Sequence, residues 1–281
     1  MKKIVLPTDF SDNAWNAIFT AVKLYKDVDC HFYLLHAYEP NSLNLLGRKS
    51  QHRLGVIYDS LSQYSAQELD KVEAYLKEHH SNPKHIFETV SKAETLEEAV
   101  NDIITSQDID LVIMGTQGAT GAKEVFLGSN TVKVLKKTKA KPILVVPMEF
   151  NFQQLKTMVF PTDFTKFYEK FELLPLIELA TLWKSKINIL HVSVEYVLNE
   201  TQKTNKKILE ERLTGLEYSH HNVPFTSNIS KSVQNYLKDN EADLMGLIRY
   251  HHTFWDKIIG EPVIKKMAFH TTVPILMLPE N

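Results

Sequence analysis

Residues 1–147 and 156–281 of this chain carry two versions of one sequence pattern. Three segments recur in the same order: IVLPTDFS at 4–11 as MVFPTDFT at 158–165, LLHA at 34–37 as ILHV at 189–192, and KPILVVP at 141–147 as VPILMLP at 273–279. Because order and approximate spacing are kept, we expect two copies of one domain, joined by a linker at 148–155. The length of 281 residues agrees with two domains.

Each copy alternates short apolar, β-branched runs with amphipathic segments. In the first copy we expect strands at 3–8, 31–37, 85–90, 109–115 and 141–147, and helices at 11–26, 61–79, 95–107 and 129–138. Ser11 is the expected N-cap of the first helix. The inward positions of the first two helices are Ala14, Ile18, Ala21, Val22 and Tyr25, then Leu61, Leu69, Val72 and Leu76. Apolar strands alternating with helices predict an α/β class: a doubly wound domain with a parallel sheet, present twice.

Composition excludes several classes of protein. The balance of 32 basic against 34 acidic residues offers no field for nucleic acid or an anionic membrane surface. The amino-terminal apolar run ends at Pro7 and Asp9, too early for a signal peptide, so we expect a cytoplasmic protein. The single cysteine, Cys30, excludes an intramolecular disulfide, and we expect it to open a buried strand as a small apolar residue.

Four of the nine glycines lie in one segment, MGTQGATGAKEVFLGSNT at 114–131. This segment leaves the fourth strand and enters a helix, which is where doubly wound sheets bind ligands. Glycines let backbone amides approach a phosphate, the helix start favours an anion, and Ser129 and Thr131 add hydroxyl donors. We expect Ser129 or Asn130 to cap the helix. The alternative is a structural crossover loop, since neither a Walker A nor a Rossmann glycine motif is present.

The spacing Gly115-x2-Gly118-x9-Gly128-Ser129 resembles the nucleotide-binding signature of the universal stress protein family. PTDFS ending the first strand, LLHA ending the second and PILVVP as the fifth also match that family's pattern. The resemblance covers nearly the whole chain as a tandem pair. It implies five-stranded domains of strand order 3-2-1-4-5 that bind ATP or a related adenine nucleotide, in a regulatory protein of the stress response.

The resemblance assigns ten residues to the nucleotide site. Pro7, Thr8 and Asp9 would line the adenosine pocket, with the Asp9 carboxylate accepting hydrogen bonds from the nucleoside. Ala37 would lie against the base, its backbone paired with the adenine edge. Ribose and phosphates would be held by Gly115, Gly118, Gly128, Ser129, Asn130 and Thr131. From its residue type alone, Asp9 should face a sugar or a metal, or else cap the first helix together with Ser11.

The second copy keeps Pro161, Thr162 and Asp163 but not the glycine loop. Glu261 stands opposite Ser129, where a carboxylate would repel phosphate. Bulky side chains stand opposite the first two glycines: Leu247 or Ile248 at Gly115, and Tyr250 or His251 at Gly118. We therefore expect one nucleotide site per chain, in the amino-terminal domain.

Histidines and aromatic residues offer further candidates. Three adjacent pairs occur, His79/His80, His220/His221 and His251/His252. Neighbouring side chains point apart, so these pairs are poor chelates and we predict no metal site. His36 and His191 occupy equivalent strand ends, and we expect both to be hydrogen-bonded structural residues. Tyr250, Phe254 and Trp255 suit either a partner surface or a cover over the vacated pocket.

The two fifth strands are apolar, and in the family's strand order they are edges. Family members usually pair these edges between subunits. We therefore expect the two domains to pair with each other through their fifth strands within one polypeptide. Further association would give a homodimer.

No set of nucleophile, base and charge-stabilising group emerges, so catalysis is not the leading hypothesis. Lys123 lies in the middle of the loop without an identifiable carboxylate partner. Nucleotide-binding regulation leads. A nucleotide-independent scaffold protein is the second hypothesis, and slow ATP hydrolysis through Asp9 and a bound Mg²⁺ is the third. A phosphoacceptor receiver is disfavoured, because the third strand ends in FETVSK without an aspartate.

Overall fold

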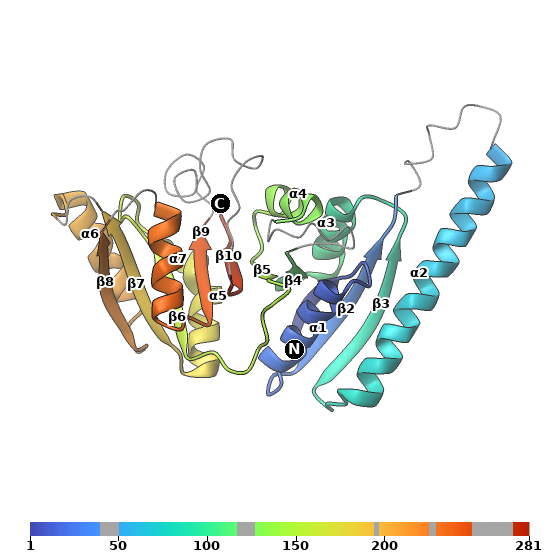
Figure 1. Cartoon of the computed structure of the whole chain (residues 1–281), viewed down its shortest axis with the longest axis horizontal. Helices are drawn as coiled ribbons and strands as arrows, with labels where there is room; N and C mark the ends of the chain where they lie inside the picture. Colours follow the sequence, from blue (N-terminus) through green and yellow to red (C-terminus); the bar gives the residue numbers. More distant parts are fainter. Residues whose placement is uncertain (40–50, 117–126, 194–196, 225–228, 249–271, 281) are drawn as a thin grey trace. The chain divides into compact units, whose positions relative to one another are not determined.

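The computed structural model describes residues 1–39, 51–116, 127–193, 197–224, 229–248 and 272–280. Contacts divide the described residues into two compact units. The first takes those of Met1–Gly121 and Gly128–Thr138, and the second those of Ala122–Leu127 and Lys139–Asn281. Strands and helices alternate along both units, which confirms the α/β class (Figure 1).

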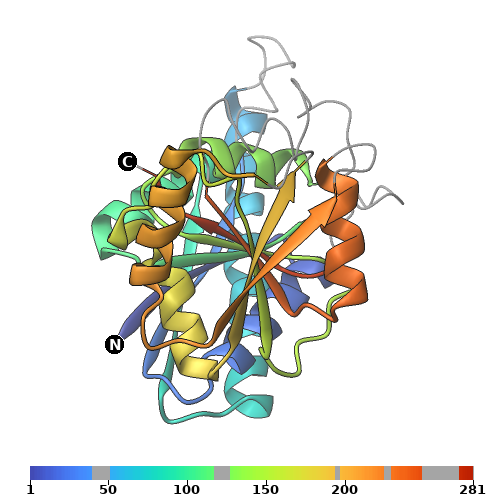
Figure 2. The ribbon, with the colours of Figure 1, turned by 90° about the vertical axis from the view of Figure 1, so that its left-hand side faces the viewer.

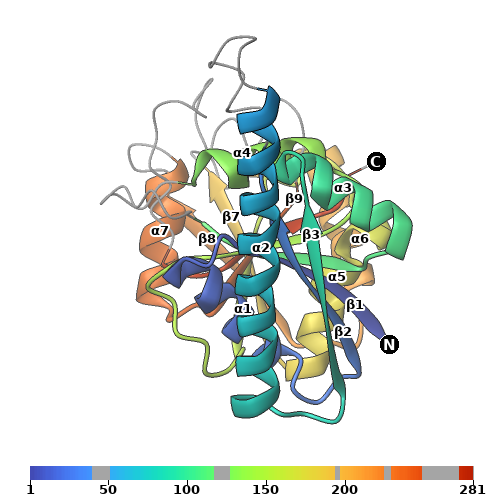
Figure 3. The same cartoon turned by 90° about the vertical axis from the view of Figure 1, so that its right-hand side faces the viewer.

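The first unit has a parallel sheet flanked by helices. Its elements are β1 (Lys2–Pro7), α1 (Asp12–Leu24), β2 (Cys30–Ala37), α2 (Gln51–His79), β3 (His85–Lys92), α3 (Leu96–Gln107), β4 (Leu111–Gly115) and α4 (Ser129–Lys137). The strands lie in the order β3-β2-β1-β4, and each neighbouring pair is parallel. Right-handed crossovers put α1 and α2 on one face and α3 on the other, because the chain moves from β1 to β3 and then returns across the sheet to β4 (Figure 3).

The helices of this unit pack as their apolar periodicity predicts. Ser11 is confirmed as the N-cap of α1, because its hydroxyl accepts the Ala14 N–H at 3.3 Å. The predicted inward residues of α1 are all buried: Ala14, Ile18, Ala21, Val22 and Tyr25. Cys30 is also buried at the start of β2, and burial raises the pKa of its thiol to about 12. The thiol is therefore an inert apolar group at neutral pH.

The helix α2 is longer than the sequence predicts. It begins at Gln51, ten residues before the expected start, and ends at His79. Three of its four predicted inward residues, Leu69, Val72 and Leu76, are buried, whereas Leu61 is half-buried. In the described ranges no helix is both long and apolar enough to cross a membrane.

The second unit contains a complete copy of the predicted sheet. Its elements are β5 (Ile143–Val146), β6 (Thr157–Pro161), α5 (Lys170–Trp183), β7 (Lys186–Ser193), α6 (Glu200–Arg212), β8 (Tyr218–Pro224), α7 (Ile229–Asp239), β9 (Leu244–Ile248) and β10 (Ile275–Leu278). The strands β6 to β10 lie in the order β8-β7-β6-β9-β10 and pair in parallel, which is the order 3-2-1-4-5. Figure 2 shows α5 and α6 on one face of this sheet and α7 on the other.

The strand β5 pairs antiparallel with β10. Leu144 lies opposite Leu276, and Val145 lies opposite Ile275. All residues of both strands are buried. The sequence repeat assigns β5 to the first copy, but by contacts it groups with the second unit because of this pairing.

Candidate functional site

The carboxyl ends of the parallel strands meet at one edge of the first unit. After β1 come Thr8 and Asp9, β2 ends in His36 and Ala37, and β4 ends in Gly115. The helix α4 begins at this same edge, because it follows β4 in the chain. Five of the predicted site positions therefore lie at or directly after the strand ends that border the start of α4: Pro7, Thr8, Asp9, Ala37 and Gly115.

The turn after β1 fixes the Asp9 carboxylate. Its Oδ1 atom accepts the Ser11 N–H at 3.2 Å and the Ser11 hydroxyl at 2.6 Å. The Thr8 hydroxyl accepts the N–H of Phe10, whose φ of 64° is in the left-handed region. Asp9 thus holds the capping Ser11 in place and is itself exposed at the edge. Both interpretations of Asp9, helix support and ligand contact, are compatible with this geometry.

Gly115 makes room for another residue of the protein. A Cβ atom at this position would lie 2.7 Å from Cγ and Oδ1 of Asn13. Asn13 is buried, and its Oδ1 accepts the hydroxyl of Thr116 at 3.2 Å. The sequence analysis did not identify Asn13. The only indication in the sequence is that Asn13 is a polar residue in the first turn of α1. Gly115 therefore has a packing role whether or not a ligand approaches it.

The start of α4 differs from the prediction. Gly128 is the N-cap, so the expectation that Ser129 or Asn130 caps the helix is wrong. Both residues already lie in the first turn, and their side chains are exposed. The first bond of the helix runs from Val132 N–H to the Gly128 carbonyl at 3.0 Å. The N–H groups of residues 129–131 precede that bond, and glycine has no side chain to cap them.

Thr131 faces inward. It is buried, and its hydroxyl donates to the carbonyl of Gly115 at 3.0 Å. The N–H of Gly128 donates to the carbonyl of Thr116 at 2.6 Å. These two bonds fasten the start of α4 to the end of β4. Gly118, the remaining predicted loop residue, lies outside the described residues.

His36 and His191 are confirmed as hydrogen-bonded residues. His36 Nδ1 lies 2.8 Å from the Ser65 hydroxyl, and His191 hydrogen-bonds to the side chain of Asn222. Burial lowers the pKa of both imidazoles, and the nearby carboxylates of Asp9 and Asp163 partly oppose the shift. Both rings are therefore neutral at physiological pH.

Buried side chains lie at the corresponding edge of the second unit, within the residues that the structure describes. Tyr168 is buried there, and its hydroxyl hydrogen-bonds to the hydroxyl of Thr162. The Asn205 amide donates to the carbonyl of Phe164 at 2.9 Å. The turn itself repeats that of the first unit, with Phe164 at a φ of 55° and its N–H bonded to Thr162.

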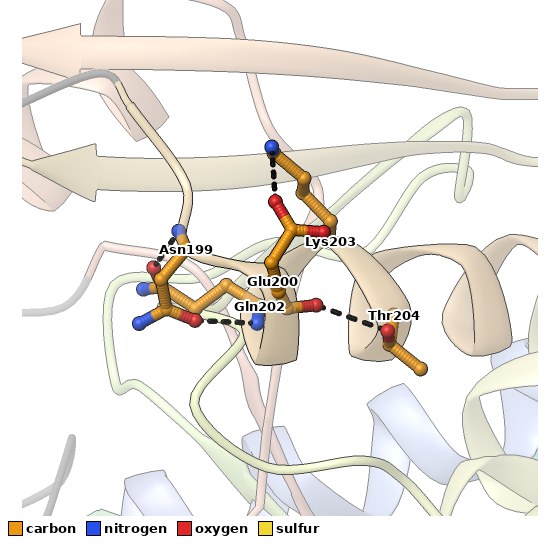
Figure 4. Close-up of polar contacts among 5 residues, drawn as sticks. All are labelled: Asn199, Glu200, Gln202, Lys203 and Thr204. Carbon is orange, nitrogen blue, oxygen red and sulfur yellow. Dashed lines mark hydrogen bonds and ion pairs between the residues drawn. The ribbon is translucent and has the colours of Figure 1, made fainter.

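The helix α6 begins at this edge, and side chains close its first turn (Figure 4). Asn199 Oδ1 accepts the Gln202 N–H at 2.9 Å, and Gln202 Oε1 accepts the Asn199 N–H at 3.0 Å. Lys203 pairs with Glu200 at 2.7 Å. The Gln202 amide also donates to the carbonyl of Asp163 at 2.8 Å. Reciprocal capping satisfies N–H groups at the start of α6, which follows β7 and therefore corresponds to α2 of the first unit. The counterpart of α4 falls in 249–271, outside the described residues.

The buried Tyr168 should make this unit sensitive to alkali. Burial raises the pKa of its hydroxyl above the ordinary value of 10.0. The unfolded chain releases this proton near pH 10, whereas the folded chain retains it, so stability that is complete below pH 10 falls as the pH rises further. Urea unfolding at neutral pH and above pH 10 should show a smaller alkaline loss in Tyr168→Phe. The exposed Tyr75→Phe is the control, and equal losses in both variants would contradict this prediction.

No group of three or more His, Cys, Asp or Glu side chains is placed to hold a metal within the part of the chain that the structure describes. His220 pairs with Glu210 at 2.7 Å, and His79 lies 3.8 Å from Glu78. The third histidine pair, the carboxylate of Glu261 and the aromatic residues Tyr250, Phe254 and Trp255 fall in 249–271, outside the described residues.

Comparisons with known proteins agree with this architecture. The model of the universal stress protein family matches residues 1–147. Two universal stress proteins of Methanocaldococcus jannaschii, MJ0531 and MJ0577, are 30% identical over 146 residues and 32% identical over 155 residues. Each alignment covers 52% of this chain, together with 81% of the first relative and 94% of the second.

Solved structures extend the likeness over both units. A universal stress protein from Archaeoglobus fulgidus aligns with a TM-score of 0.66 at 16% identity, covering 99% of this chain and 98% of its own. A putative universal stress protein from Pseudomonas aeruginosa aligns with a TM-score of 0.59 at 10% identity, covering 99% and 93%. At these identities the structures show a shared fold. With the family match over residues 1–147, the chain belongs to the universal stress protein family.

Proposed function

We propose that this chain is a regulatory protein of the stress response that binds one adenine nucleotide, in its amino-terminal domain. The start of α4 carries the proposal. Its first turn presents the N–H groups of residues 129–131 behind Gly128, on the edge that also bears Asp9. A helix start with uncapped donors and a partial positive charge is suited to a phosphate.

The described residues suit the parts of such a ligand. The backbone and hydroxyl of Ser129 and the backbone of Asn130 would donate to phosphate oxygens. The exposed Asp9 carboxylate would accept from ribose hydroxyls, which keeps its charge away from the phosphates. At the end of β1, the Thr8 N–H donates to the carbonyl of Leu35 in β2 at 2.8 Å. Ala37 lies two residues beyond Leu35, where its backbone would pair with the edge of the base.

Other predicted site residues would act indirectly. Thr8, Gly115 and Thr131 are occupied in bonds or packing that shape the edge. Pro7 is buried at the end of β1. We propose that these four residues position the ligand-contacting groups, with Gly118 adding a backbone contact from the loop. ATP or a related adenine nucleotide is the expected cofactor, and a phosphate-bound Mg²⁺ belongs to the slow-hydrolysis alternative.

The proposed organisation has domains at 1–147 and 156–281, joined by a linker at 148–155. The antiparallel pairing of β5 with β10 supports association of the domains through their fifth strands. Two such chains would form a homodimer in the cytoplasm. The buried Tyr168 and the carboxylate of Glu261 in place of Ser129 support a second domain that binds no nucleotide.

A nucleotide extraction and titration would test the proposal. The purified protein should release adenine nucleotide on denaturation, and protein freed of ligand should titrate with one equivalent of ATP per chain. Two equivalent sites per chain would overturn the single-site proposal. An empty protein whose melting temperature does not change with ATP would instead support the scaffold hypothesis, which the loss of the glycine loop from the second copy also favours. Steady release of ADP that Asp9→Asn abolishes would support slow hydrolysis.

A further inference from the structure

The first turns of α2 extend past the carboxyl end of β3, beside the edge of the proposed nucleotide site (Figures 1 and 3). Residues 58–64 of this helix are exposed or half-buried, and the side chain that follows them, Ser65, is buried. Helix residues that do not pack against a sheet are usually polar, so apolar or aromatic residues there indicate another contact. This stretch nevertheless carries Tyr58 and Tyr64.

A chain of hydrogen bonds fixes how α2 faces the edge. The buried Ser65 hydroxyl lies 2.8 Å from His36 Nδ1 and 2.6 Å from the hydroxyl of Ser91. It therefore joins the helix to the ends of both β2 and β3. Tyr58 lies seven residues before Ser65, which is two turns along the same helix face. Tyr64 directly precedes Ser65 in the chain. The hydrogen bonds of Ser65 thus set the direction of both tyrosines.

Five aromatic rings are linked along this edge, and we name them the aromatic wall: Phe10, His36, Tyr38, Tyr58 and Tyr64. Ring centroids lie 4.6 Å apart for Phe10 and His36 and 6.0 Å apart for Phe10 and Tyr64. Tyr38 lies 6.1 Å from His36 and 6.2 Å from Tyr58. The wall surrounds the end of β2, where Ala37 stands between His36 and Tyr38.

The rings of the wall remain partly accessible to solvent. Tyr58 is 42% exposed and Tyr64 is 50% exposed. The equivalent of Phe10 in the second unit, Phe164, is more deeply buried. It is 2% exposed and packs beside His191 and His220. The same turn therefore buries its aromatic ring in the second unit. In the unit with the proposed site the corresponding ring is half-buried and continues into exposed rings.

We propose that the aromatic wall stacks against the base of the bound nucleotide, an inference that rests on the proposed function. The wall adjoins both proposed adenosine contacts, since Phe10 follows Asp9 and Tyr38 follows Ala37. Aromatic side chains can stack on any planar base. A purine has the larger ring system, so its stacking free energy is more favourable than that of a pyrimidine. The wall would favour purine over pyrimidine nucleotides and contribute little to the binding of the phosphates.

Affinity measurements on the full chain, freed of ligand, test this inference. ATP should bind Tyr58→Leu/Tyr64→Leu about 10-fold or more weakly than the wild type, as for lost base stacking. Inorganic tripolyphosphate has no base, so its affinity should be the same for both proteins. Leucine keeps an apolar side chain at each position, and urea unfolding checks that the fold is intact.

The matched control is Tyr75→Leu. Tyr75 belongs to the same helix, is 41% exposed and packs against Trp15 at 5.3 Å, away from the wall. Its ATP affinity should equal that of the wild type. Unchanged ATP affinity in the double variant, or an equal loss for tripolyphosphate, would overturn the wall while the proposed function stands. Failure of the wild-type chain to bind ATP would overturn the proposed function and the wall with it.

Discussion

Ser129→Glu should remove nucleotide binding and leave the protein folded. The substitution copies Glu261, which stands opposite Ser129 in the second copy of the repeat. Two like charges about 4 Å apart repel by about 1 kcal/mol in water and about 4 kcal/mol near a protein surface. Against a polyphosphate we expect at least about 100-fold weaker binding, or about 2.8 kcal/mol.

The same carboxylate should not harm the empty protein. Ser129 is the first residue of α4 and is exposed, and a negative charge in a first turn stabilises a helix by about 0.3–1 kcal/mol. In Ser129→Glu, the ATP affinity measured by titration should therefore fall, whereas the free energy of unfolding measured in urea should rise slightly. The control is Ser129→Gln, which has the size of glutamate without its charge. If Ser129→Gln binds ATP as weakly as Ser129→Glu, size rather than charge is responsible and the phosphate position is wrong.

Leu276→Asp should prevent folding of the second unit. Leu276 is fully buried in β10 opposite Leu144 of β5. Aspartate there would be an unpaired charge in an apolar layer, which costs more than the 2–5 kcal/mol of a simple truncation and approaches the whole stability of a domain, about 5–15 kcal/mol. Val145→Asp, in the partner strand, should have an effect of the same order, because Val145 is equally buried opposite Ile275.

Soluble yield and urea unfolding would measure these effects. Met148→Asp is the matched control, since Met148 follows β5 by two residues and is 49% exposed. It should leave yield and unfolding midpoint unchanged. Soluble Leu276→Asp and Val145→Asp proteins with wild-type midpoints would disprove the pairing of the two strands, and with it the proposed association of the domains.

Most strands were predictable because burial on both faces leaves a continuous apolar run, whereas β3, at the end of the strand order, has one buried residue, Phe87. Every predicted strand of the first copy overlaps an observed one, from β1 to β5. The start of α2 was not predictable in this way. Its extra residues, 51–60, lie mostly beyond the sheet and contain Gly55, which lowers helix propensity. Without a sheet to face, that segment has no reason to show an apolar period of 3.6 residues.

The position of the candidate site residues at one sheet edge was predictable. Asp9, Ala37 and Ser129 follow strand ends or open a helix, and topology alone brings such positions to one side of a parallel sheet. Spacing could not reveal which partner a glycine accommodates, so the packing of Asn13 against Gly115 was missed. Nor could it show that Tyr168, opposite Ala14 in the repeat, is buried at the second edge, because burial depends on tertiary packing.

The turn after the first strand is the same in both units. Phe10 and Phe164 share a left-handed backbone, each held by a threonine hydroxyl, and Asp9 and Asp163 each bind the hydroxyl of the next residue but one. The second unit keeps this conformation although its sequence lacks the glycine loop. The tetrapeptide PTDF is therefore a folding signal that redirects the chain from strand to helix, and it would survive the loss of a ligand. A genome survey that counts this tetrapeptide as a marker of nucleotide binding would assign two sites to such a duplicated chain, twice the number that we propose.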